Sequence, residues 1–273
     1  MLFRSGKTEE ALSQAAEGYG AKGATAIVMN PNTGEVLAMA NWPGFDPSDL
    51  QDATPDELEN RATGFTYEPG STFKAFTVAS ALSDHVVTPH SSFYLPPEIR
   101  VYDRTIGESH PRGPVTLTTA QILAQSSNVG AVTIGEREGA SRFSQWINRF
   151  GFGQPTDLGF PGEERGIVPE LKDYSGSTMG NLPIGQGLAV TPIQIATAYA
   201  AIADGGILRR LLTEMGPVRA AKTIVRTFPI DADCHQISAI LVNDVTACTP
   251  GEPGACLDGL ALSSRVKTLR FYK

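Results

Sequence analysis

The chain has 273 residues, of which 41% are hydrophobic and 19% are charged, and its formal net charge is −7 at pH 7. This length allows a sizeable core, in one large domain or two small ones. The acidic balance and the lack of a basic stripe argue against nucleic acid as a partner. No apolar run approaches the roughly 18–20 residues of a membrane-spanning helix, and the N-terminal MLFRSGKTEEAL lacks the apolar core of a secretory signal. We therefore expect neither an export signal nor a membrane anchor within these residues.

The first part of the chain predicts a helix and a hairpin. Residues 5–20 are polar and rich in Ala and Glu, which indicates a surface helix. The stretch ATAIVMNPNTGEVLAMAN then has β-rich runs on either side of the turn cluster at residues 30–34. Residues 41–60 are rich in Pro and Asp and predict a loop with a short helix at DELEN.

An apolar helix is expected after the sequence YEPG. Pro69 and Gly70 interrupt the backbone, Ser71 is a favoured helix N-cap, and FKAFTVASAL continues as a largely apolar helix to about Leu82. Residues 83–115 hold many Pro, His and polar residues, so we expect an irregular excursion over the surface.

The following segment predicts a helical block. LTTAQILAQ predicts a helix that stops at residues 126–128 (SSN), because serine and asparagine compete for helical backbone hydrogen bonds. A second helix resumes near Val129, and SRFSQWINRF is another amphipathic helix before a Gly/Pro-rich loop region that reaches about Leu188. TPIQIATAYAAIADGG is the clearest helix, with Thr191 as N-cap and Pro192 in its first turn.

Beyond Arg210 the pattern weakens. HQISAILVNDV is a candidate helix, and ALSSRVKTLRFYK is a candidate final strand. Cys234, Cys248 and Cys256 form no CxxC pair and have no zinc-type histidine pattern, so we interpret them as structural or incidental. The scattered histidines predict no metal site, and no nucleotide-binding GK[ST] motif follows the glycines of GFGQPTDLGFPGE, so we expect no metal and no cofactor.

A hairpin, a helical block and a late strand together predict an α/β (α+β) fold with an antiparallel sheet flanked by helices.

Ser71 and Lys74 lie one helical turn apart and share a face. A serine needs an adjacent base to become a nucleophile, and a lysine can serve when burial lowers its pKa. The start of a helix also supplies positive dipole to a developing oxyanion. A capping serine beside a lysine with a buried stem is the commoner explanation of such a pair when it stands alone. The SSN loop at residues 126–128 could add a proton relay and a substrate-orienting amide, although an isolated SSN is more often only a loop.

Taken together, these motifs resemble the penicillin-recognising serine enzymes, whose motif set is S-x-x-K, S-x-N and K-T-G. The chain is most similar to the transpeptidase domain of class B penicillin-binding proteins, from about Gly23 to Arg209, and Glu68 in YEPGSTFK is typical of the division-type members. The stretches that carry the resemblance are TAIVMNPNTGEVLAMANWPGFDP, NRATGFTYEPGSTFKAFTVASAL, QSSNVGAVTIG and GQGLAVTPIQIATAYAAIADGG.

The resemblance implies a function and roles for four residues. Ser71 would be the acyl-accepting nucleophile, Lys74 its general base and Ser126 a proton shuttle, while Asn128 would help to hold the substrate. The implied activity is peptidoglycan D,D-transpeptidation in cell wall synthesis at division, with peptidoglycan stem peptides as substrates, β-lactam antibiotics as ligands and cell-division membrane proteins as partners. The implied location is the extracytoplasmic face of the bacterial cytoplasmic membrane. The implied fold is a five-stranded antiparallel sheet with helices on both faces.

The sequence departs from the family pattern near its C-terminus. No K-T-G is present: Lys222-Thr223 is followed by Ile, and Lys267-Thr268 by Leu. The likeness also fades after Arg210. We therefore predict an incomplete transpeptidase-like catalytic domain at residues 1–210 and a divergent or foreign tail at residues 211–273, with the last sheet strands missing. Two other functions stay open, a serine β-lactamase and a catalytically dead penicillin-binding scaffold.

Overall fold

The computed structural model describes residues 2–48, 50–212, 226–227 and 266–272. Its main sheet is antiparallel and has the strand order β2-β1-β9 within the described residues. β1 (Gly23–Met29) and β2 (Val36–Trp42) form the predicted hairpin, and β9 (Val266–Tyr272) pairs with the free edge of β1. The sequence prediction of a final strand is confirmed at β9. The described residues supply three strands of this sheet, where the family resemblance implied five.

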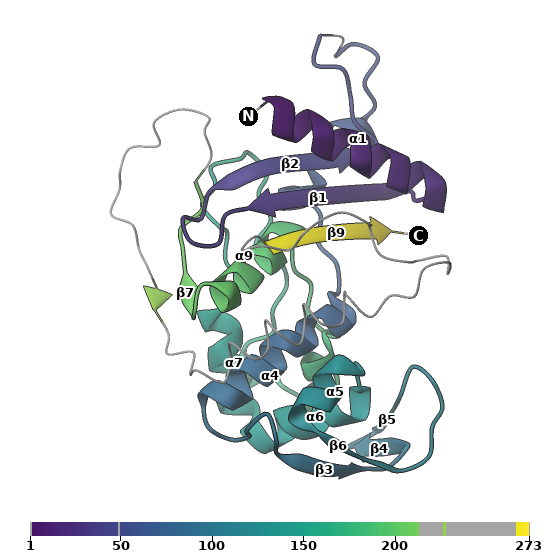
Figure 1. The fold of residues 1–273 in the computed structure, drawn as a ribbon, viewed down its shortest axis with the longest axis vertical. Helices are drawn as coiled ribbons and strands as arrows, with labels where there is room; N and C mark the ends of the chain where they lie inside the picture. The colour runs from purple at the N-terminus through teal and green to yellow at the C-terminus, as the bar shows by residue number, and fades with distance from the viewer. Residues whose placement is uncertain (1, 49, 213–225, 228–265, 273) are drawn as a thin grey trace.

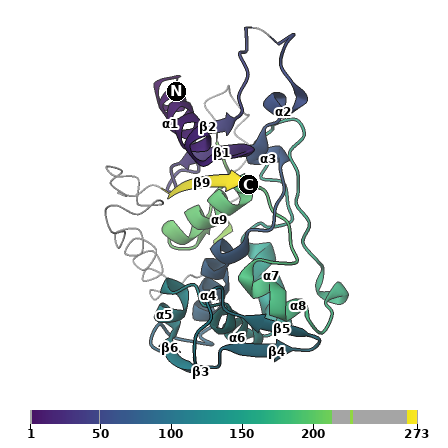
Figure 2. The ribbon, with the colours of Figure 1, turned by 90° about the vertical axis from the view of Figure 1, so that its right-hand side faces the viewer.

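Helices cover both faces of the sheet (Figure 1), and the alternation of side chains along β1 explains how. Ala24 and Ala26 pack with Leu12 of α1 (Leu2–Tyr19) in one buried cluster. Ile27 packs with Ile193 of α9 (Pro192–Ala203) in a second cluster. Small residues thus face α1 and larger residues face α9. Figure 2 shows the same arrangement from the side, with α1 and α9 on opposite faces.

The second half of the core is a helical lobe around α4 (Lys74–Ser83), whose residues from Lys74 to Leu82 are all buried. A helix that is apolar on every side needs neighbours all around it. α5 (Thr119–Ala124), α6 (Asn128–Glu138) and α7 (Ala140–Arg149) pack against it. An aromatic cluster joins this lobe to α9: the rings of Phe76 and Tyr199 lie 4.8 Å apart, centroid to centroid.

The expectation of an irregular excursion at residues 83–115 is wrong. β3 (Ser92–Leu95) pairs with β6 (Val115–Thr118), and β4 (Glu98–Val101) pairs with β5 (Arg104–Gly107). These strands have four residues each, too short for a clear alternating pattern. Tyr102 and Asp103 turn the β4–β5 hairpin, with Tyr102 at φ 54°, so the glycine that usually marks such a turn is missing from the sequence.

The predicted start of the clearest helix is confirmed in detail. Thr191 caps α9 by accepting from the Gln194 N–H, while the Gln194 side chain accepts from the Thr191 N–H. The remaining elements are short: α2 (Pro55–Leu58), α3 (Arg61–Gly64), η1 (Gly70–Phe73), η2 (Leu171–Asp173), α8 (Thr178–Asn181), η3 (Leu182–Ile184), β7 (Ile207–Leu208) and β8 (Arg226–Thr227). The candidate helix HQISAILVNDV and the three cysteines lie outside the described residues. Among the described helices, none is both long and apolar enough to cross a bilayer.

Candidate active site

The turn that carries Ser71 is fixed by backbone contact with a distant glycine. The Gly70 N–H donates to Gly185 O at 2.9 Å. Gly185 has φ +75°, and a Cβ there would lie 2.1 Å from Gly70 O. Only glycine at position 185 lets the two backbone segments approach this closely without a displacement. The GQG segment therefore determines where the Ser71 turn lies.

Two further contacts join the same two segments. Tyr67 and Val190 exchange backbone hydrogen bonds of 3.1 and 2.9 Å, which form an antiparallel bridge. The Glu68 carboxylate accepts from the Gly187 N–H at 2.9 Å. Glu68, which the sequence linked only to the division-type subfamily, thus has a structural role in holding the segment before Ser71.

The prediction that Ser71 is a helix N-cap is wrong. Ser71 lies inside the 3-10 turn η1, whose N-cap is Pro69, and the N-cap of α4 is Phe73. A capping hydroxyl would use a lone pair on a backbone N–H. Ser71 is exposed, and within the described residues no hydrogen bond engages its Oγ. The hydroxyl is therefore available for chemistry at the start of a buried helix.

Lys74 follows one turn later and points to the SSN loop. Its side chain is buried, with the residue 1% exposed. Nζ donates to Ser126 O at 2.5 Å, to Ser126 Oγ at 3.0 Å and to Asn128 Oδ1 at 2.7 Å. The structure thus brings together Lys74, Ser126 and Asn128, three of the four site residues expected from the sequence, and places Ser71 on the turn that leads directly into Lys74.

The SSN loop holds its three side chains in different roles. Ser126 has a left-handed backbone with φ 53°, which is unusual for a residue with a Cβ, and its side chain is exposed. Ser127 is buried and caps α6 by accepting from the Gly130 N–H at 3.0 Å. Asn128 accepts from Lys74 and donates through Nδ2 to Gly107 O at 2.9 Å. The loop is therefore built around the two residues on either side of Ser127.

The electrostatics of Lys74 combine two opposing effects. Burial lowers the pKa of Lys74 to about 8, and the negative charge of Glu108 acts in the opposite direction. The three oxygen acceptors around Nζ also favour the ammonium form. At neutral pH the lysine is accordingly mostly charged, with a minor neutral fraction that is far larger than an exposed lysine would have.

Glu108 is a site residue that the sequence did not indicate. It follows β5 and accepts from Ser127 Oγ at 2.6 Å and from the Asn128 N–H at 2.7 Å, and Arg112 donates to it at 2.5 Å. Burial raises the pKa of Glu108, but these hydrogen bonds and the Arg112 charge outweigh it and the pKa is lowered overall. The residue lay in the segment expected to be irregular, where no motif pointed to it.

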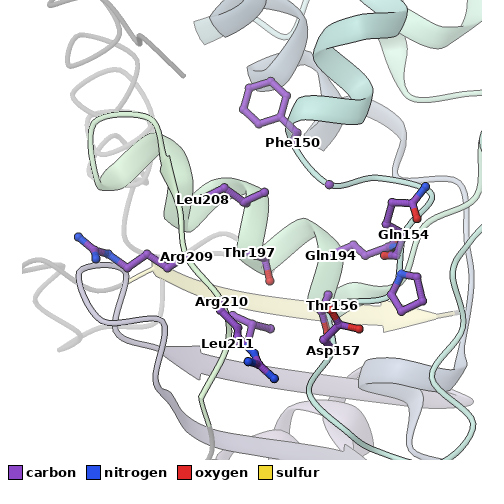
Figure 3. Close-up of a pocket in the computed structure, with 12 residues that line it drawn as sticks. Phe150, Gln154, Thr156, Asp157, Gln194, Thr197, Leu208, Arg209, Arg210 and Leu211 are labelled. Carbon is purple, nitrogen blue, oxygen red and sulfur yellow. Dashed lines mark hydrogen bonds between the residues drawn. The ribbon is translucent and has the colours of Figure 1, made fainter. Parts of the chain in front are cut away.

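A cavity of about 260 Å³ lies elsewhere, between the end of α7, α9 and residues 208–211 (Figure 3). None of the four candidate site residues lines it. The polar groups of Gln194 and Thr197 that face it already bond to the protein backbone. Chemistry is therefore assigned to the Lys74 cluster and not to this cavity.

Comparison with known proteins places this geometry in a family. A family model described as "Penicillin binding protein transpeptidase domain" matches residues 24–232. Penicillin-binding protein PbpB of Mycolicibacterium smegmatis is 36% identical over 200 residues, which are 73% of this chain and 31% of that protein. The probable peptidoglycan D,D-transpeptidase FtsI of Caulobacter vibrioides is 32% identical over 268 residues, which are 97% of this chain and 44% of that protein.

The fold agrees with these sequence matches. The crystal structure of penicillin binding protein 3 from Mycobacterium tuberculosis, complexed with aztreonam, superposes with a TM-score of 0.82 at 31% identity, covering 88% of this chain and 56% of that chain. The chain thus spans about a third to a half of the length of the curated relatives named above. The matches in sequence and in fold agree with the motifs that the site brings together. The chain belongs to the family of penicillin-binding protein transpeptidase domains.

Proposed function

We propose that this chain is the catalytic part of a peptidoglycan D,D-transpeptidase that cross-links stem peptides through an acyl-enzyme on Ser71. The observation that carries the proposal is that Lys74 Nζ donates to both Ser126 and Asn128 at the start of α4. Ser71, whose hydroxyl no described hydrogen bond engages, lies on the turn that leads into this helix. The sequence similarity to relatives named peptidoglycan D,D-transpeptidases supports the same reaction class.

In the first step, the Ser71 hydroxyl attacks the carbonyl carbon of the donor stem peptide. The neutral form of Lys74 takes the hydroxyl proton, because an ammonium group has no lone pair to accept it. Negative charge develops on the carbonyl oxygen, and the N-terminal end of the η1–α4 segment, which carries Ser71, favours that charge. The tetrahedral intermediate then collapses to an ester on Ser71.

The departing amine needs a proton, and Ser126 lies in the right place to pass one on. Its Oγ is 3.0 Å from Lys74 Nζ, so the proton taken by Lys74 can move through the Ser126 hydroxyl to the leaving nitrogen. In the second step the amine of an acceptor stem peptide attacks the ester. Its proton returns by the reverse route, and Ser71 is regenerated with one new amide bond between the peptides.

The β-lactamase alternative requires a base that activates water against the acyl-enzyme. Glu108 is the carboxylate whose charge acts on Lys74, and its oxygens are already engaged by Ser127, Asn128 and Arg112. A carboxylate in this state is a weak candidate for a water-activating base. This favours an acyl-enzyme with a β-lactam that persists, as expected of a transpeptidase.

A labelling experiment tests the proposal. The full chain is incubated with a fluorescent penicillin, and intact-mass analysis follows the adduct over time in the wild type and in Ser71→Ala. A stable single adduct, located on the Ser71 peptide and absent from the variant, is expected. Rapid turnover of the adduct would indicate a β-lactamase instead. The absence of any adduct would indicate a dead scaffold, and an adduct in Ser71→Ala would refute the assigned nucleophile.

The cellular setting follows from the same proposal. Relatives named FtsI and the Glu68-containing motif support a role in division, on the extracytoplasmic face of the cytoplasmic membrane and in contact with cell-division membrane proteins. A fluorescent fusion of the full-length protein is expected to gather at the division septum. An even distribution around the cell outline would speak for a role in general wall growth.

A further inference from the structure

The Glu108 carboxylate links the end of β5 to the start of α6. Its side chain is 8% exposed. Oε1 accepts from Ser127 Oγ at 2.6 Å and Oε2 accepts from the Asn128 N–H at 2.7 Å. Hydrogen bonds to a charged acceptor are stronger than bonds between neutral groups, and negative charge is favoured at a helix start. One side chain thus fixes two consecutive residues of the loop.

Ser127 and Asn128, which Glu108 binds, belong to the same loop as the oxygen atoms that accept hydrogen bonds from Lys74 Nζ. Ser126 supplies two acceptors to Nζ and Asn128 a third. Ser126 also holds a left-handed backbone, a conformation that persists only where the surrounding structure enforces it. Backbone bonds from the Ser126 and Ser127 N–H groups to Leu123 O and Ile122 O hold this turn on one side. The bonds of Glu108 to the next two residues hold it on the other. Asn128 is held a second time, by its own bond to Gly107 O at 2.9 Å, directly before Glu108.

We propose that Glu108 is a positioning residue for acyl transfer, whose carboxylate holds the 126–128 loop against Lys74 and is itself held by Arg112. The inference rests on the proposed function and adds a pair of residues to its machinery. Arg112 lies where it can hold the carboxylate, since it donates to Glu108 Oε1 at 2.5 Å, to Gly113 O at 3.0 Å and to Leu95 O at 3.3 Å. Its guanidinium is therefore fixed by backbone carbonyls next to β6 and at the end of β3.

Glu108 and Arg112 should also shift the pKa of Lys74 in opposite directions. The charge of Glu108 favours the ammonium form, so its removal lowers the pKa of Lys74. Arg112 is a cation bound to the Glu108 carboxylate. Its removal leaves the charge of Glu108 less compensated, so we expect it to raise the pKa of Lys74. A purely structural pair would not shift the two pH profiles in opposite directions.

Other charged groups near α4 lie too far along their helices to explain such shifts. Within the described residues, α5, η1 and η3, which pack against α4, carry no titratable side chain. α6 carries Glu136, Arg137 and Glu138 at its far end, about 12 to 15 Å along the helix from Asn128. α7 carries Arg142, whose charge acts on Glu138, and Arg149, which stacks on Trp146. Within this part of the chain, Glu108 is thus the charge that acts on Lys74, and Arg112 is the cation bound to Glu108.

The experiment compares Glu108→Gln, Arg112→Gln and the wild type as full chains. Penicillin acylation rates are measured from about pH 5.5 to about pH 10. Both variants should lose roughly 10- to 100-fold in rate at their best pH, because the loop is less well held. The pH range over which the acylation rate rises (the rising limb of the pH–rate profile) should move to lower pH in Glu108→Gln and to higher pH in Arg112→Gln, by roughly half a unit to one unit each. Glu98→Gln, an exposed change of the same charge on β4, should leave rate and limb unchanged.

A second measurement separates this inference from the proposed function. NMR titration of the Lys74 side chain, without any β-lactam, should show the same opposite displacements of its pKa. Limbs or titrations that move in one direction for both variants, or not at all, would overturn the positioning role. A wild-type chain that acylates nowhere, yet shows the opposite displacements of the Lys74 pKa, would refute the proposed function and leave the coupling of Glu108 to Lys74 standing.

Discussion

Lys74 is held between burial, which favours the neutral amine, and three oxygen acceptors, which favour the ammonium. With a pKa of about 8, roughly a tenth of the chains carry a neutral Lys74 at pH 7. Acylation that uses this amine as a base should therefore rise with pH through neutrality and level off above about pH 8. The rise is a property of the buried site, because an exposed lysine would titrate more than about two units higher.

Replacement of Lys74 by arginine separates charge from basicity. Arginine keeps the positive charge but stays protonated across this range and has no free lone pair. In Lys74→Arg we expect penicillin acylation to fall by roughly 10²-fold or more and to lose its rise with pH. Initial rates of fluorescent penicillin labelling measure both. Lys172→Arg, at an exposed position of η2, is the matched control and should label normally. Near-normal acylation of Lys74→Arg would mean that the lysine only shapes the site.

Glu138 is a second buried ionisable residue, at the far end of α6. Ser80 Oγ lies 2.9 Å from Thr77 O and 2.8 Å from Glu138 Oε2, and its single proton can serve only one of them. A protonated carboxyl supplies the missing donor. Burial raises the pKa of Glu138 to about 8 and the nearby charge of Asp84 acts in the same direction, against the Ser80 hydrogen bond and the charge of Arg142, which lower it. The group is thus neutral in the folded chain over a range in which it is charged in the unfolded chain.

The resulting prediction concerns stability as a function of pH. A folded-state pKa above the unfolded value means that the contribution of Glu138 is fully present below about pH 4.5 and is lost as the pH rises through about 8. Glu138→Gln keeps a neutral, hydrogen-bonding side chain, so its stability should lack this loss and exceed that of the wild type at pH 8 by ~2 kcal/mol. Urea unfolding at pH 4.5 and 8 measures it, with exposed Glu9→Gln as control. Parallel pH dependence of wild type and Glu138→Gln would contradict the prediction.

At the scale of elements, the Gly70–Gly185 contact is one of three that join the residues around Ser71 to the segment before α9. Gly185→Ala puts a Cβ 2.1 Å from Gly70 O and forces a side chain into φ +75°. Gly187→Ala, with φ +76° but no atom closer than 3.7 Å to its Cβ, carries the backbone strain without the collision. The backbone strain should cost each variant about 1 kcal/mol of stability, and Gly185→Ala should lose more because of the collision.

Acylation should distinguish the two glycine variants. Gly185→Ala displaces the turn that holds the nucleophile, and a shift of this kind costs roughly 10²-fold in rate. Gly187→Ala should keep at least most of its rate. Labelling rates, together with urea unfolding of the same samples, make the comparison. Equal losses of rate in the two variants would show that the strain, and not the contact with Gly70, determines the position of Ser71.

At the scale of the whole molecule, the question is how residues 211–273 relate to the catalytic part. We propose that they form a divergent tail to an incomplete transpeptidase-like domain at residues 1–210, since the sequence likeness recognised in the motifs ends there and the family match ends at residue 232. The match to the Caulobacter relative nevertheless extends over 268 residues. β9 pairs with all seven residues of β1, so one segment of this tail adds a strand to the main sheet.

A proline in β9 tests how much the sheet depends on that segment. Thr268 pairs with Ile27 at the centre of the ladder. Thr268→Pro removes one backbone N–H from the strand, so the full chain should lose ~1–3 kcal/mol and aggregate more readily as the edge of β1 becomes exposed. Thr268→Val, which keeps the N–H, is the control. Urea unfolding and light scattering measure the two effects. Equal stability of the two variants would mean that β9 contributes little and that the tail is dispensable for the fold.

Sequence alone determined the features that depend on neighbours along the chain. The β1–β2 hairpin, the Thr191 N-cap of α9, and the S-x-x-K and S-x-N motifs follow from local patterns, because turn residues, caps and one-turn spacings act over a few residues. The same local reasoning failed at residues 83–115, where four-residue strands and the Tyr102–Asp103 turn leave no clear pattern.

Only the tertiary structure decided what surrounds the reactive groups. The contact of Gly70 with Gly185, the direction of Lys74 toward Ser126, and the hold of Glu108 on the loop all join residues that are far apart in the sequence. Such contacts depend on how separate elements pack, and a linear pattern carries no record of that packing. The residue types of the chemistry are therefore visible in the sequence, whereas the groups that position and charge them become visible only when the chain is folded.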